Sequence, residues 1–106
     1  PPYNIVKSGN NYTITLAVAG FSKSDLGISV QENELVIKGS TNDSNKEIEF
    51  LHRGIAGRNF ERKFRLADTI KVTDANYENG LLHIFLERKI PEHQKPRKIE
   101  INSKIN

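Results

Sequence analysis

The sequence predicts an all-β fold, an antiparallel immunoglobulin-like β-sandwich with an extended C-terminal tail. Three observations support this prediction. Short segments alternate apolar and polar residues, turn-forming residues separate these segments, and no long stretch shows the apolar spacing of a helix. About seven or eight such segments follow one another closely, which favours two packed antiparallel sheets in a single domain.

The expected strands have apolar residues at every second position. In the first of them, Ile14, Leu16 and Val18 share one face, so that face is expected to lie in the core. The strands are expected at residues 12–19, 26–30, 35–38, 47–51, 59–66, 71–77 and 81–86.

Turn signals separate these strands. Ser22 and Asp25 have the spacing of a capping pair and predict a single helical turn. Residues 31–34 are expected to form a hairpin connection, and Asn79-Gly80 predicts a second hairpin because both residues tolerate positive φ. The uniformly polar residues 40–46 indicate an exposed loop.

We therefore expect one domain at residues 1–89, with a long loop at 40–57, and an extension at 90–106. Pro91 and Pro96 bracket a polar stretch in this extension, which should be extended. The chain opens on Pro1 and contains no methionine, so we expect it to be a piece of a longer protein.

The composition argues against several classes of function. The chain has no cysteine, which excludes disulfides and thiolate chemistry, and no apolar run long enough to span a bilayer. The net charge of +3 lies in residues 87–106, which hold six basic and three acidic side chains but no aromatic residue. We therefore expect no nucleic-acid and no membrane partner.

No set of residues resembles an active site or a metal site. His52, His83 and His93 lie in different segments without a metal-ligand spacing. The motif 54–57 contains two glycines but precedes no helix that could bind a phosphate. We expect no enzyme activity and no cofactor.

Two features point to binding. Arg62 shares the phase of Phe60 and Phe64, so its guanidinium points toward the apolar side of its strand. It either reaches water at an edge or forms an ion pair with a carboxylate on a neighbouring strand or another subunit. Ile99 and Ile101 are isolated among polar residues, and in an extended tail they point the same way, either in a short terminal strand or as a motif that docks on a groove.

Four motifs in register resemble the α-crystallin domain of small heat-shock proteins. Residues 75–82 resemble its A-x-x-x-n-G-v-L signature, and residues 60–66 resemble its F-x-R-x-F-x-L strand. Residues 18–26 resemble its early glycine-containing stretch, although Ala19 replaces the usual proline, and the tail has the I-x-I motif at Ile99, Glu100 and Ile101. The resemblance runs from about residue 3 to 102 and is greatest to the bacterial inclusion-body-binding group.

This resemblance implies a mode of assembly. The strand in the long loop, at Glu47, Ile48, Glu49, Phe50 and Leu51, would pair with a partner's strand at Asn4, Ile5 and Val6. The tail motif would dock in a groove formed by Leu26, Ile28, Val30, Ala75 and Tyr77.

The resemblance also implies an ATP-independent holdase that binds non-native or aggregating proteins, and the absence of cysteine leads us to expect it in the reducing cytoplasm. It would form homodimers and larger oligomers, also with a paralogous small heat-shock protein, and pass clients to ATP-driven disaggregases. The alternative is a sandwich-type co-chaperone adaptor that binds one specific folded partner. That type lacks the swap loop and the tail motif, so these two features separate the hypotheses.

Overall fold

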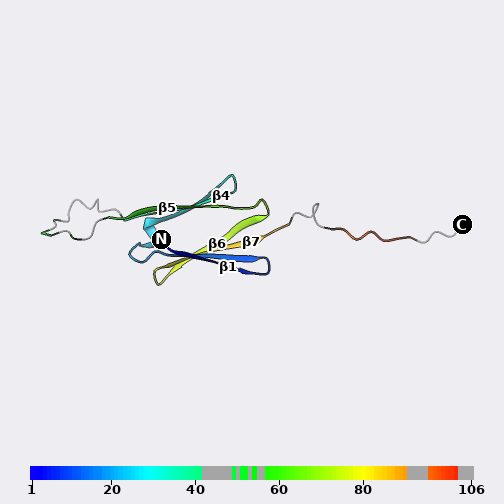
Figure 1. Ribbon diagram of the computed structural model, residues 1–106, viewed down its shortest axis with the longest axis horizontal. Coiled ribbons are helices and arrows are strands. Elements are labelled where there is room, and N and C mark those ends of the chain that lie inside the picture. The colour runs from blue at the N-terminus through cyan, green and yellow to red at the C-terminus, as the bar shows by residue number, and fades with distance from the viewer. Residues whose placement is uncertain (42–48, 50, 53, 55–56, 91–95, 103–106) are drawn as a thin grey trace.

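The computed structural model is a β-sandwich of two antiparallel sheets (Figure 1). The first sheet has the order β1 (Tyr3–Ser8), β2 (Asn11–Ala17), β7 (Leu81–Arg88) and β6 (Ile70–Glu78). The second has the order β3 (Leu26–Gln31), β4 (Glu34–Ser40) and β5 (Asn59–Arg65). The structure describes residues 1–41, 49, 51–52, 54, 57–90 and 96–102. The predicted antiparallel β-sandwich is therefore confirmed.

Turns with positive φ produce the tight hairpins. Asn79 and Gly80 have φ of 52° and 75° between β6 and β7, as the Asn-Gly pair predicts. Glu32 and Asn33 have φ of 51° and 65° between β3 and β4, where the hairpin connection was expected. The predicted helical turn is the 3₁₀ element η1 (Lys23–Asp25), and the Asp25 carboxylate accepts a hydrogen bond from the Ser22 backbone amide at 2.9 Å.

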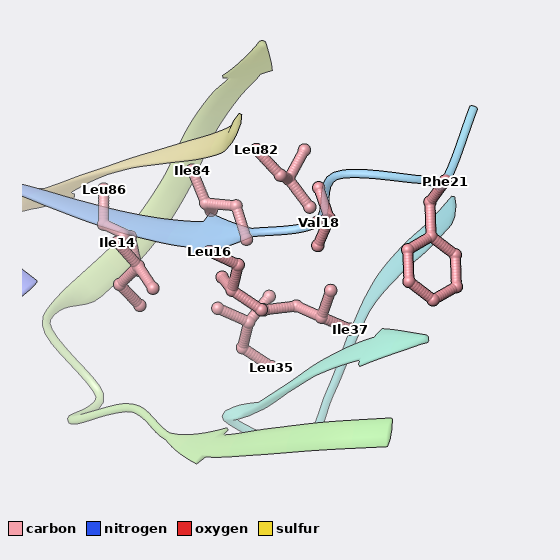
Figure 2. Packing of buried hydrophobic residues seen from close by; sticks show 9 residues of the cluster. All are labelled: Ile14, Leu16, Val18, Phe21, Leu35, Ile37, Leu82, Ile84 and Leu86. Carbon is pink, nitrogen blue, oxygen red and sulfur yellow. The ribbon is translucent and has the colours of Figure 1, made fainter. Parts of the chain in front are cut away.

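The core lies between the two sheets (Figure 2). Strands β2 and β7 supply alternate residues from one layer, and β4 supplies the facing residues from the other. Burial of these side chains is the main favourable contribution to folding. The buried residues are Ile14, Leu16, Val18, Phe21, Leu35, Ile37, Leu82, Ile84 and Leu86.

The two sides of the sandwich are closed differently. On one side, Tyr3 of β1 packs edge-on against Phe64 of β5, with ring centroids 5.1 Å apart. The Arg62 guanidinium lies 5.0 Å from the centre of the Tyr3 ring, so three side chains bridge the sheets there. On the other side, the edge strands β3 and β6 leave a hollow between them.

The expected strands match the observed ones apart from shifts of a residue or two at their ends, with two further differences. Strand β1 gives no alternating signal, because all six of its residues are exposed, and only the family resemblance places a strand there. In the expected strand at 47–51, neither Glu49 nor Leu51 lies in a strand, and residues 47, 48 and 50 lie outside the described part of the chain.

Candidate docking groove

The hollow between β3 and β6 has a volume of about 200 Å³. Four of the five predicted groove residues line it, namely Leu26 and Ile28 from β3 and Ala75 and Tyr77 from β6. Leu26 and Ile28 are half-buried, because they pack against the core but have no strand beyond them. The structure thus brings together residues that lie about fifty positions apart in the sequence.

The fifth predicted groove residue, Val30, does not line this hollow. Its side chain is 50% exposed, and it lies close to the turn at Glu32 and Asn33. Sequence reasoning also missed three lining residues, which are Lys23, Asn76 and Leu82. The signal for Leu82 was present, since the alternation of the last strand turns it inward.

A hydrogen bond next to the hollow connects β6 to the segment that precedes β3. The Tyr77 hydroxyl on β6 donates to the backbone carbonyl of Phe21, which lies in the segment leading to β3. Because Tyr77 is half-buried, this bond is shielded from water and fixes the ring against the core. The hollow is therefore preformed in the single chain.

The two isoleucines of the predicted tail motif are exposed to solvent in this chain. Ile99 is 74% exposed and Ile101 is 98% exposed, so neither side chain is seated in the chain's own hollow. Both residues lie outside any strand. Their apolar surface is free to contact another surface.

The predicted acceptor strand is an edge strand with exposed apolar side chains. Asn4, Ile5 and Val6 lie in β1, which pairs with β2 on one side and is the outermost strand of its sheet. Ile5 is 54% exposed and Val6 is 60% exposed. An unpaired edge of this kind is a template for strand addition.

Arg62 has partners within its own chain. Its Nη2 atom donates to the backbone carbonyl of Pro1 at 2.8 Å, and its guanidinium packs on the Tyr3 ring. Among the described residues, Glu61 instead forms ion pairs with Lys38 and Lys63. Within the described chain, the guanidinium is thus satisfied by a carbonyl and a ring, and an ion pair to another subunit stays a prediction.

The described residues contain no cluster of three His, Asp or Glu side chains that could hold a metal ion. The same residues include no helix with the length and apolar character needed to cross a membrane.

Comparison with known proteins agrees with this geometry. The family model described as Hsp20/alpha crystallin family matches residues 4–102. The small heat shock protein IbpA of Escherichia coli is 57% identical over 103 residues, which cover 96% of this chain and 75% of that protein.

Two solved structures have the same fold. A small heat shock protein from Synechococcus phage S-ShM2 is 38% identical, with a TM-score of 0.65 over 95% of this chain and 98% of that one. A C-terminally truncated form of the small heat shock protein AgsA from Salmonella typhimurium is 34% identical, with a TM-score of 0.68 over the same shares. Because the family model spans nearly the whole chain and these relatives exceed 30% identity, the chain belongs to the Hsp20/alpha-crystallin family of small heat shock proteins, as its motifs predict.

Proposed function

We propose that this chain is an ATP-independent holdase that binds non-native or aggregating proteins in the cytoplasm. It self-assembles into dimers and larger oligomers, with itself or with a paralogous small heat-shock protein. It passes its clients to ATP-driven disaggregases and uses neither a catalytic step nor a cofactor. Membership of the small heat shock protein family supports a chaperone role.

One observation supports the proposal above all: the chain has both an apolar hollow and an exposed apolar tail motif, and the motif does not occupy the hollow of its own chain. The hollow between β3 and β6 is lined by Leu26, Ile28 and Tyr77, and the exposed Ile99 and Ile101 are not buried against any described residue of the same chain. Side chains at alternate positions of an extended segment fit such a groove between strand edges. The proposed occupant is the tail of another subunit.

The same logic applies to β1. The proposed dimer contact pairs a partner's residues 47–51 with the free edge at Asn4–Val6 and covers the exposed side chains of Ile5 and Val6. Backbone hydrogen bonds supply much of the affinity in this mode of recognition. Arg62 packs on Tyr3 of this strand, so a carboxylate of the partner is its proposed contact across the dimer.

The strength of one tail contact can be bounded. Burial of two isoleucine side chains contributes at most about 3–6 kcal/mol. Association and the ordering of the tail offset much of this gain. A single contact is therefore weak and exchanges readily, whereas many contacts in one assembly hold through avidity.

Light scattering from a thermally unfolding enzyme tests the proposal. The wild-type chain should reduce the scattering in proportion to its concentration, without ATP, and should sediment as a dimer or a larger species. The double variant Ile99→Ala with Ile101→Ala should form smaller assemblies while its far-UV spectrum stays unchanged. The matched control is Lys98→Ala with Asn102→Ala, which alters the flanking polar residues and should assemble normally.

Two results would contradict the proposal. A chain that remains a monomer at high concentration would remove self-assembly. A chain that leaves client scattering unchanged at every ratio would remove the holdase activity.

A further inference from the structure

A second cluster of side chains lies at the base of the long loop. It consists of Arg58, Thr41 and the turn Ala19–Phe21, and we name it the loop clamp. Arg58 immediately precedes β5 in one sheet, whereas Ala19–Phe21 follow β2 in the other. The clamp therefore ties the base of the loop to the opposite layer of the sandwich.

The guanidinium of Arg58 makes two contacts with that turn. Its Nη2 atom donates to the Ala19 carbonyl at 3.0 Å, and its central carbon lies 5.1 Å from the centre of the Phe21 ring. A planar guanidinium can stack on a ring and donate in its own plane at the same time, which a lysine ammonium cannot do.

The turn is shaped to admit this side chain. Gly20 has φ of +94°, and a Cβ atom built there would lie 2.1 Å from Nη2 of Arg58. Any side chain at position 20 would thus displace the guanidinium. Phe21 is in turn fixed by Phe60 of β5, whose ring is perpendicular to it with centroids 5.2 Å apart.

The backbone of Arg58 is also fastened to the other end of the loop. The Thr41 amide donates to the Arg58 carbonyl at 2.8 Å, and the Arg58 amide donates to the Thr41 hydroxyl. Next to them, the Ser40 hydroxyl donates to the Asn59 side-chain carbonyl at 2.8 Å. Both ends of the loop are therefore held together and held against the turn.

We propose that Arg58 is a positioning residue for self-assembly, which holds the two ends of the long loop, Thr41 and Arg58, against the turn Ala19–Phe21 and so sets the strength of the subunit contact made by that loop. This inference rests on the proposed function, in which the loop pairs with a second copy of the chain. Anchoring the base of a loop reduces the ordering cost of every contact that the loop makes. Arg58 is exposed, so its removal should affect association more than folding.

Sedimentation over a range of concentrations tests this proposal through the dissociation constant of the dimer. Arg58→Ala is expected to raise that constant about tenfold, and Arg58→Lys should give an intermediate value because the charge remains above the Phe21 ring. The control is Arg65→Ala, which removes an exposed arginine at the far end of β5 and should leave the constant unchanged. Urea midpoints, measured at concentrations where each chain is monomeric, should agree among all four chains.

A double-mutant cycle adds a readout specific to the clamp. Gly20→Ala should also weaken the dimer, because the new Cβ displaces the guanidinium. In the Arg58→Ala background there is no guanidinium to displace, so the effect of Gly20→Ala on the dissociation constant should be smaller than in the wild type, and this difference is the readout. The backbone strain at position 20 is present in both backgrounds and cancels.

The outcomes separate this inference from the proposed function. If the wild type dimerises and Arg58→Ala leaves the dissociation constant unchanged, the clamp proposal is overturned and self-assembly stands. An equal loss in Arg65→Ala, or a fall in urea midpoint large enough to account for the weaker dimer, also overturns it. A wild type that never associates overturns both.

Discussion

A peptide with the sequence of residues 96–102 should bind the hollow between β3 and β6, and its affinity should depend on Ile99 and Ile101. Ile99 is 74% exposed and Ile101 is 98% exposed, so most of their apolar area is available for burial. Replacement of each isoleucine by alanine removes three carbons, worth about 0.8 kcal/mol each when fully buried, or about 4–5 kcal/mol for the pair. The hollow is open to solvent on one side, so we expect about half of this, near 2 kcal/mol, and hence about thirtyfold weaker binding.

Fluorescence anisotropy of the labelled peptide measures this difference. The receptor is the full chain with Ile99→Ala and Ile101→Ala, so that its own tail does not compete. Ala75→Glu places a charge at the wall of the hollow and should abolish binding. Ser29→Glu is the matched control, because it adds the same charge to β3 at an exposed position that does not line the hollow. Equal affinity of the isoleucine and alanine peptides, or equal loss in the two glutamate variants, would refute the docking of the motif in this hollow.

Three further predictions concern stability and are read from urea denaturation of the monomer. Leu16→Ala opens a cavity at a fully buried position and should lower the free energy of unfolding by about 2–5 kcal/mol. Gly80→Ala should lower the free energy of unfolding by about 1–3 kcal/mol, because φ is +75° and a new Cβ would lie 3.3 Å from Ala19. Gly27→Ala is the control, since a Cβ there would meet no atom within 4 Å. Equal effects of the two substitutions would contradict this argument. Tyr77→Phe removes the hydrogen bond to Phe21 and should cost about 1 kcal/mol, and an unchanged midpoint would show that water replaces the bond.

Periodicity in the sequence was enough to predict the layers and the core. Ile14, Leu16 and Val18 share one phase, and all three are buried. The last strand behaves in the same way, since its inward residues Leu82, Ile84 and Leu86 are buried. The reason is that a strand with one face on a core and one face in water must alternate.

Features that depend on tertiary neighbours could not be predicted in this way. Strand β1 has no buried face, so no burial pattern selects it, and its position follows from pairing with β2. Arg62 was expected either to reach water at an edge or to pair with a carboxylate, and instead the carbonyl of Pro1, sixty-one residues earlier, accepts its hydrogen bond. Local sequence does not reveal such a partner.

The groove contains both residues that periodicity predicted correctly and one whose place depends on tertiary packing. The alternation of residues 26–30 placed Leu26, Ile28 and Val30 in one phase, but the hollow ends before Val30. The position at which an edge strand stops facing the opposite sheet depends on how the two sheets pack, and the sequence of the strand alone does not show it. The hollow is therefore lined by Leu26 and Ile28 but not by Val30.

The position of the free strand edges has a consequence for symmetry. A tail that leaves one chain and enters the hollow of the next joins two different surfaces, so the contact is heterologous. Such a contact repeats with a fixed rotation, and it forms a ring or shell when the rotations close and an open polymer when they do not. The pairing at β1, on the opposite side of the sandwich from the hollow, would join two chains about a twofold axis. The number of subunits in an assembly would then be set by the angle between these two contacts and not by the strength of either.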